Sequence, residues 1–153
     1  MNKKNYLILA IFVLAITIPA FAQSEENAVK AVIESLFDGM RAKNTDQIAV
    51  VFSEDAIMQT IETTGEIGEV KASSVADFVK GIGSLPDDTV LDERISDYQI
   101  TIDGPLATVW TPYEFYFNDK FSHCGVNSFQ LVKMAEGWKI VYIIDTRRKD
   151  GCS

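Results

Sequence analysis

The fold of this chain is decided by the stretch from Ala107 to Arg148, which contains three segments typical of long β-strands. They read ATVWTPYEFYF (107–117), FSHCGVNSFQLVKM (121–134) and GWKIVYIIDTRR (137–148). β-Branched and aromatic residues dominate each segment, and short polar turns separate them. The stretch therefore predicts three successive antiparallel strands.

The residues before this stretch have the periodicity of helices. Ser24 caps a first helix that ends at Lys43-Asn44, a second short helix covers 45–52, and Ser73 or Ser74 caps a third that ends near Ile82. Apolar residues of the first helix recur at steps of three and four, which gives one buried face: Val29, Val32, Ile33, Leu36, Phe37 and Met40.

Two further strands complete the predicted order. Residues 56–61 form the first strand, 63–68 form a loop or a weak hairpin, and 94–102 form a strand that leads through Asp103-Gly104 into the decisive stretch. Helix, helix, strand, helix and then a meander of strands is the pattern of an α+β domain with its helices on one face of the sheet.

Residues 1–22 have the composition of a signal peptide. Lys3 and Lys4 precede an apolar run from Tyr6 to Ile18, and Ala20-Phe21-Ala22 matches a small-x-small cleavage site. The run is shorter than the roughly 20 residues that span a bilayer, and no cysteine follows for a lipid anchor. We expect cleavage before Gln23, export to the periplasm or the medium, and a single mature domain over 23–153 without a membrane segment.

The charge balance excludes two classes of partner. The chain has 22 acidic and 14 basic residues, and its formal net charge is −8. Nucleic acids and anionic membrane surfaces require clustered lysine and arginine. The short cluster Arg147-Arg148-Lys149 is followed at once by Asp150, so neither partner is expected.

The chain has two cysteines, Cys124 and Cys152, and one histidine. In an oxidising compartment the cysteines can form one disulfide, and the alternative is two free, partly buried thiols. Because no cluster of histidines or cysteines accompanies them, they do not indicate a metal site. The sequence has no glycine-rich phosphate loop and no Gly-x-Ser-x-Gly elbow, so we expect no cofactor and no metal.

Two motifs carry a resemblance to a known superfamily: Ser122-His123-Cys124-Gly125-Val126-Asn127-Ser128-Phe129-Gln130-Leu131, and Gly137-Trp138-Lys139-Ile140 with Asp145-Thr146-Arg147-Arg148. Together with the element order, they resemble the nuclear transport factor 2-like superfamily, including its SnoaL-like cyclases and its exported "putative lumazine-binding" branch. The resemblance implies a cone-shaped fold of three N-terminal helices on a strongly curved antiparallel sheet. It also implies homodimers.

Strand pairing predicts which side chains face the inside of the cone. A turn at Ala135-Glu136 places Phe129 opposite Tyr142, Asn127 opposite Ile144 and His123 opposite Arg148. The predicted concave face therefore offers a mixed apolar and polar ligand-binding set: Tyr113, Phe115, Asn127, Phe129 and Tyr142.

The turn before His123 leaves two registers open. A three-residue turn over 118–120 places Phe115 opposite His123 and turns Tyr113 inward. A two-residue turn places Glu114 there instead, because a shift of one residue exchanges the two faces of a strand. The choice decides between a histidine beside an aromatic wall and a carboxylate–histidine dyad.

His123 is the strongest catalytic candidate, with Glu114 or Tyr113 as its partner, because imidazole exchanges a proton near neutral pH. The alternative is a structural histidine at the start of a strand. Asp145 with the following arginines forms either a terminal salt bridge or a mouth that binds anions. Asp55 is either a turn residue or an acid of the site.

Three functions remain open. The first is an exported domain that holds a small hydrophobic or aromatic molecule in the cone without catalysis. The second is a lyase, isomerase or cyclase that uses His123 as an acid or base. The third is a protein-docking domain with a filled cone. A cavity of several hundred cubic ångströms next to His123 favours the first two.

Since both faces of 107–117 are apolar, we also expect the convex face to be covered by a second copy of the chain.

Overall fold

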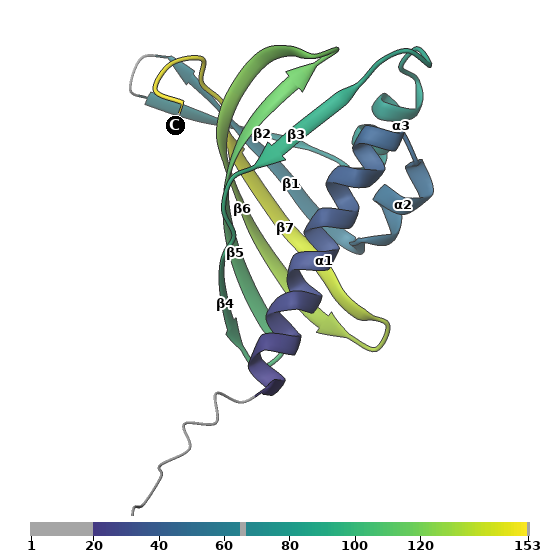
Figure 1. Cartoon of the computed structure of the whole chain (residues 1–153), viewed down its shortest axis with the longest axis vertical. Coiled ribbons are helices and arrows are strands. Elements are labelled where there is room, and N and C mark those ends of the chain that lie inside the picture. The colour runs from purple at the N-terminus through teal and green to yellow at the C-terminus, as the bar shows by residue number, and fades with distance from the viewer. Residues whose placement is uncertain (1–19, 65–66, 153) are drawn as a thin grey trace, which may run out of the picture.

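A computed structural model describes residues 20–64 and 67–152 as an α+β fold, which confirms the predicted class (Figure 1). Within these residues, three helices and seven strands follow one another in this order: α1 (Ala20–Ala42), α2 (Thr45–Val50), β1 (Phe52–Thr64), β2 (Ile67–Ser73), α3 (Val75–Gly83), β3 (Leu91–Ile95), β4 (Gln99–Asp103), β5 (Leu106–Phe117), β6 (Lys120–Met134) and β7 (Gly137–Thr146).

The seven strands form one strongly curved sheet that does not close. Its order is β2-β1-β7-β6-β5-β3, and β4 also pairs with β5. Helix α1 lies along the concave face, and α2 and α3 lie beside its C-terminal end (Figure 1). Every pair is antiparallel except β1 and β7, which run parallel. The sequence did not predict this parallel pair, because it joins segments that are far apart along the chain.

The predicted strand over 94–102 is divided in two. β3 ends at Ile95 opposite Tyr113, and β4 begins at Gln99 opposite Trp110. The division falls at Pro112 of the neighbouring strand, which has no N–H to donate. The carbonyl of Pro112 instead accepts a hydrogen bond of 3.1 Å from the backbone N–H of Ser96.

The turn between β5 and β6 resolves the register left open by the sequence. It has two residues, Asn118 and Asp119, both with positive φ, as a tight hairpin turn requires. An irregularity next to Phe115 then shifts the pairing by one residue, and Phe115 lies opposite His123. The aromatic register is therefore confirmed, although it arises from a bulge and not from a three-residue turn.

A second irregularity corrects the predicted pairing of β6 with β7. Leu131 lies opposite Ile140, but Gln130 lies opposite Tyr142, so Val141 is an extra residue. Beyond this point Phe129 pairs with Ile143 and not with Tyr142. The faces of β7 exchange as a result: Ile143 and Asp145 are concave, in place of the predicted Tyr142 and Ile144.

The core fills the half of the fold between the N-terminal part of α1 and the sheet. Trp138 is buried there, and its indole N–H donates to Glu25 at 3.0 Å, beside an ion pair of 2.7 Å between Glu25 and Lys133. The predicted apolar face of α1 packs on buried residues of β5, β6 and β7: Ala107, Val109, Phe129, Leu131, Trp138 and Ile140.

The predicted signal peptide lies mostly outside the described residues, since residues 1–19 are not described. Helix α1 begins at Ala20 and so runs through the predicted cleavage site before Gln23. Among the described residues, no helix is both long and apolar enough to cross a bilayer. At the other end of the chain, a disulfide joins Cys124 to Cys152, one of the two states that the sequence left open.

Candidate functional site

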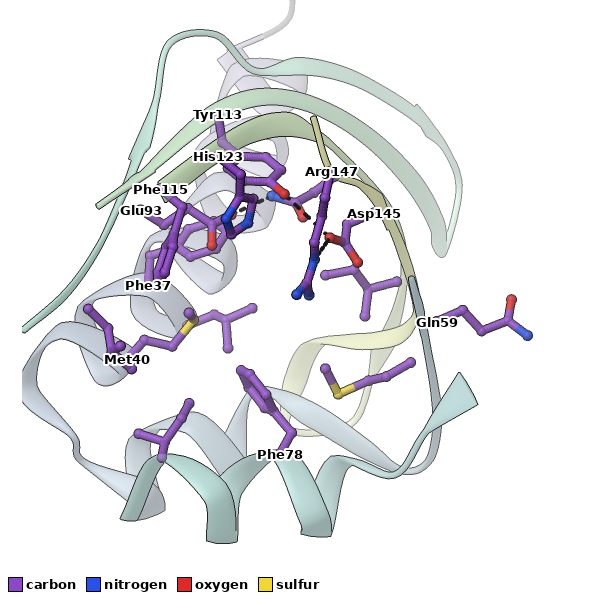
Figure 2. Close-up of a pocket in the computed structure, with 16 residues that line it drawn as sticks. Phe37, Met40, Gln59, Phe78, Glu93, Tyr113, Phe115, His123, Asp145 and Arg147 are labelled. Atoms are coloured by element: carbon purple, nitrogen blue, oxygen red, sulfur yellow. Dashed lines mark hydrogen bonds and ion pairs between the residues drawn. The ribbon is translucent and has the colours of Figure 1, made fainter. Parts of the chain in front are cut away.

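A cavity of about 310 Å³ lies where the core ends, between the C-terminal half of α1, α3 and the curved sheet (Figure 2). Most of its lining is apolar. Aliphatic, thioether and aromatic side chains from six elements form this lining: Leu36, Phe37, Met40, Met58, Phe78, Ile82, Leu91, Phe115 and Ile143. An apolar wall of this kind favours ligands with an apolar body.

Phe129 is not part of this wall. Its side chain is fully buried in the core, and its ring meets the ring of Phe37 edge-to-face at 6.3 Å between centroids. The ring of Phe37 in turn borders the cavity. Phe129 therefore faces inward, as its concave position predicts, but it supports the wall and does not line it.

Asp145 and Arg147, at the end of β7, form a polar group in this lining. Arg147 Nε donates to Asp145 Oδ2 at 2.7 Å. The hydroxyl of Tyr113 donates to the carbonyl of Thr146 at 2.9 Å and lies 3.3 Å from the same carboxylate oxygen. Tyr113 is thus inward, as predicted, but its hydroxyl holds the end of β7.

Glu93 is a half-buried residue with a carboxyl group that the sequence analysis did not single out. Its Oε1 accepts a hydrogen bond of 2.7 Å from Nδ2 of Asn127, a predicted site residue that does line the cavity. Burial raises the pKa of Glu93 to about 7, and the neighbouring charge of Asp145 adds to this shift. This carboxyl therefore changes its charge near neutral pH.

His123 borders the cavity beside two aromatic rings. Its ring lies 5.1 Å from that of Phe115 and 5.8 Å from that of Tyr113, between centroids. Nδ1 forms a hydrogen bond of 3.0 Å with the hydroxyl of Ser122. Burial, together with the positive charge of Arg147, lowers the pKa of His123 below its usual value. The imidazole is therefore neutral at pH 7.

The alternative dyad of Glu114 and His123 is wrong. Glu114 lies opposite Cys124, and its carboxylate accepts a hydrogen bond of 2.8 Å from the hydroxyl of Tyr116. Cζ of Arg94 in turn lies 3.8 Å from the centroid of the Tyr116 ring. Glu114 is not among the residues that line the cavity, because the bulge before His123 turns it to the other face.

Tyr142 also lies outside the cavity, contrary to its predicted place on the concave face. Its hydroxyl donates to Gln59 Oε1 at 2.6 Å. Gln59 borders the cavity, but its side chain points away from it (Figure 2). The extra residue Val141 is the reason, because it exchanges the faces of β7. Asp55, the other acid considered, is exposed in β1 and does not line the cavity.

The end of β7 is held tightly against β6. Gly125 leaves no room for a Cβ, which would collide with the carbonyl of Thr146. Beyond it, the backbones of Cys124 and Arg148 exchange two hydrogen bonds of 2.9 Å, and the disulfide joins Cys124 to the C-terminal tail. These constraints fix the backbone on both sides of Arg147.

Glu93 had a signal that sequence reasoning could have used. Leu91, Glu93 and Ile95 alternate along one strand, so Glu93 occupies an inward position between two apolar residues. The predicted strand began at Arg94 and missed this pattern. The contributions of Phe78 and Met58 had no local signal, because the third helix and the first strand meet the site only through tertiary packing.

The chemistry of the site is that of proton exchange and hydrogen bonding. Glu93 changes its charge near neutral pH, the neutral imidazole of His123 can accept a proton, and Arg147 and Asn127 supply N–H donors. Among residues 20–64 and 67–152, no group of three or more histidine, cysteine, aspartate or glutamate side chains is placed to hold a metal ion.

Comparisons with known proteins agree with this fold. Residues 24–143 match the sequence profile of a family described as "Putative lumazine-binding". No curated protein matches the chain at a significant level. A solved nuclear transport factor 2-like protein with a cystatin-like fold, from Novosphingobium aromaticivorans, is similar at a TM-score of 0.67, with 12% identity and 86% of each chain covered.

Two other similar structures have names that mention an activity. One is described as a "putative scytalone dehydratase" from Novosphingobium aromaticivorans, with a TM-score of 0.64, 14% identity, and coverage of 83% of this chain and 86% of that chain. The other is a "putative dehydratase" of the nuclear transport factor 2-like family from Streptomyces avermitilis, with a TM-score of 0.64, 9% identity, and coverage of 83% and 98%. At these identities the likeness concerns the fold alone.

Proposed function

The chain belongs to the family described as "putative lumazine-binding", within the nuclear transport factor 2-like superfamily, and we propose that it binds a small, largely apolar or aromatic molecule in its cavity. The observation that carries this proposal is the cavity itself. An apolar wall from six elements faces a small number of polar groups, which is the usual composition of a small-molecule site.

The size of the cavity limits the ligand. Its volume of about 310 Å³ is at the lower end of the roughly 300–1,000 Å³ of ligand sites. The ligand is therefore small, of the order of one ring system. The third function considered was a docking domain with a filled cone, and the presence of this cavity argues against it.

The experiment is a ligand screen with a filled variant and a matched control. Met58 lines the cavity, whereas Met134 lies outside it and is exposed. A library of small aromatic and alicyclic compounds is screened by NMR against the chain from Gln23, the Met58→Trp variant and the Met134→Trp variant. We expect binders that Met58→Trp loses and Met134→Trp retains. A screen in which no compound binds the unmodified chain overturns the proposal.

A second candidate function is proton transfer on the bound molecule. It is favoured by one observation, the presence of Glu93 and the neutral His123 in the same cavity. Groups with a pKa near the working pH are efficient general acids and bases. Binders from the screen are incubated in D₂O, and exchange of carbon-bound hydrogen is followed by NMR. Exchange that Glu93→Gln or His123→Ala abolishes supports an enzyme, and no exchange supports binding alone.

We also propose that the chain is exported after cleavage before Gln23. The basic start, the apolar run and the small-x-small motif support this, and so does the disulfide, since disulfides persist in oxidising compartments. Expression with residues 1–22 in a bacterial host, followed by mass spectrometry of the periplasmic and external fractions, tests it. A chain that keeps residues 1–22 and stays in the cytoplasm contradicts it.

A homodimer is proposed from the outer face of the sheet. Ile57 and Trp110 are 53% and 48% exposed. Their neighbours in the sequence point toward the core, so these two side chains lie on the outer face. Apolar side chains on an outer face are those that a second copy would cover. Light scattering of the purified chain tests this. We expect twice the mass of one chain, and the mass of a single chain at micromolar concentration contradicts it.

A further inference from the structure

The guanidinium of Arg147 has donors that the protein does not use. Its Nε is bonded to Asp145, and within residues 20–64 and 67–152 its two terminal nitrogens have no hydrogen-bond partner. Figure 2 shows the guanidinium pointing into the cavity. The free edge of an arginine side chain carries parallel N–H donors that match the two oxygens of a carboxylate.

One oxygen of each carboxyl group on the same side of the cavity is already engaged. Oδ2 of Asp145 accepts from Arg147 and lies near the hydroxyl of Tyr113, and Oε1 of Glu93 accepts from Asn127. A ligand that brings further donors, such as an amine, would share these oxygens with the protein or reach only the second oxygen of each carboxyl group. A ligand that brings acceptor oxygens finds free donors, so the site favours an acceptor head group.

The part of the apolar wall that belongs to α1 and α3 lies across the cavity from this arginine. Phe37, Met40 and Phe78 face Arg147 and Asp145 in Figure 2. A molecule that fills the cavity therefore has an apolar end against the helices and a polar end against β7. This arrangement specifies an amphipathic ligand with its oxygens on one side only.

We propose that the ligand is a small organic acid, whose carboxylate binds the free edge of Arg147 and whose apolar ring lies against α1 and α3. This inference rests on the proposed function and names the ligand class of the same site. Neutral amides of the same shape lack the charge that makes hydrogen bonds to arginine strong.

Glu93 makes the binding of an acid depend on pH. When Glu93 is ionised, its charge adds to that of Asp145 and repels a bound carboxylate. Other charged or titratable groups border Glu93 on two sides: Tyr113, His123, Asp145 and Arg147 in the cavity, and Lys30, Glu34, Asp38, Arg41, Arg94 and Tyr98 in the groove between α1 and β3. Because the pKa of Glu93 is raised to about 7, this carboxyl ionises as the pH rises from 6 to 8, and the affinity for an acid falls over the same range.

The test uses matched probes and matched variants. The probes are benzoate with benzamide, and cyclohexanecarboxylate with cyclohexanecarboxamide, and their Kd values are measured by NMR titration at pH 6. Arg147→Met removes the charged edge. Arg148→Met is the control, because Arg148 is the adjacent residue and does not line the cavity.

We expect each acid to bind the unmodified chain at least about tenfold more tightly than its amide, since a hydrogen bond to a charged group is worth about one factor of ten or more. Arg147→Met should lose this preference and still bind the amides, whereas Arg148→Met should keep it. Equal affinity for acid and amide in the unmodified chain overturns the inference. Amides that bind without their acids overturn it and leave the proposed function intact, whereas failure of all four probes and of the library overturns both.

A second measurement separates the charge of Glu93 from a structural effect. Between pH 6 and pH 8 the acids should lose at least about threefold in affinity for the unmodified chain, and the amides should lose none. Glu93→Gln keeps an acceptor for Asn127 and cannot ionise, so its affinity for acids should be constant over this range. A pH dependence that persists in Glu93→Gln contradicts the role of this carboxyl.

Discussion

Asn127 and Glu93 form a hydrogen bond of 2.7 Å although they lie on β6 and β3, with β5 between them. Only the strong curvature of the sheet brings side chains two strands apart within bonding distance. Their contact places a carboxyl group in a confined, mostly apolar space, where its ionisation is disfavoured.

Glu93→Gln should therefore stabilise the fold at high pH. The pKa of Glu93 is about 7 in the folded chain and near 4.5 in the unfolded chain, so the folded chain binds more protons between these values. Through this group the stability is fully present below pH 4.5 and is lost as the pH rises through 7. The loss is up to about 3 kcal/mol, from about 1.4 kcal/mol per pKa unit.

The measurement is the free energy of unfolding by urea at pH 5 and pH 8, for the unmodified chain and for Glu93→Gln. The difference between the two proteins should favour the variant more at pH 8 than at pH 5. A difference that is equal at both pH values contradicts the assignment of this titration to Glu93.

Gly125→Ala should destabilise the fold and displace the end of β7. The new methyl group would collide with the carbonyl of Thr146, which accepts the hydrogen bond of Tyr113. Overpacking of this kind costs about 1–3 kcal/mol. Gly81→Ala is the control: Gly81 lies in α3 with open space around its Cα, so this substitution should leave the fold equally or more stable, by up to about 1 kcal/mol. Thermal unfolding of both variants checks the prediction, which fails if the two behave alike.

Loss of the disulfide should lower the free energy of unfolding by about 2–4 kcal/mol, because the bridge between Cys124 and Cys152 closes a loop and so restricts the unfolded chain. Urea unfolding with and without reductant measures it, and Cys152→Ser should match the reduced protein and be insensitive to reductant. Since the bridge also holds the tail beyond Arg147, reduction should weaken the preference for acids over amides. An unchanged free energy of unfolding after reduction contradicts the structural role of the bridge.

Tyr113→Phe and Tyr142→Phe should show which of the two tyrosines lies on the cavity face of the sheet. The first removes a partly buried hydrogen bond to Thr146, which is worth about 1 kcal/mol, and it alters the position of Asp145 and Arg147. The second removes a hydroxyl that contacts Gln59 outside the cavity. Only Tyr113→Phe should change ligand affinity. A larger effect of Tyr142→Phe contradicts the observed register of β7.

The sequence was a good guide to the fold and a partial guide to the site. Periodicity predicts the elements because burial imposes it locally, as the buried face of α1 from Val29 to Met40 shows. The predicted positions of Tyr113, Phe115, His123 and Asn127 at the site are those of the structure. Glu114, Phe129 and Tyr142 do not line the cavity.

The errors have a common physical cause. A strand pattern predicts which residues share a face, but one inserted residue exchanges the faces beyond it. Val141 in β7 and Ser122 in β6 are such insertions. Glu93 was not predicted as a site residue for another reason. Its pKa and its hydrogen bond depend on Asn127 and Asp145, which are distant in sequence.

The central claim, that a small acid occupies the cavity, is tested most directly by methyl NMR of the chain labelled at methionine and isoleucine, titrated with benzoate and with cyclohexanecarboxylate. Cavity methyl groups belong to Met40, Met58, Ile82 and Ile143, and reference methyl groups outside it belong to Ile57, Ile67 and Met134. We predict that the acids shift the cavity signals and leave the reference signals in place. Shifts confined to the reference residues, or no shifts with either acid, would contradict the claim.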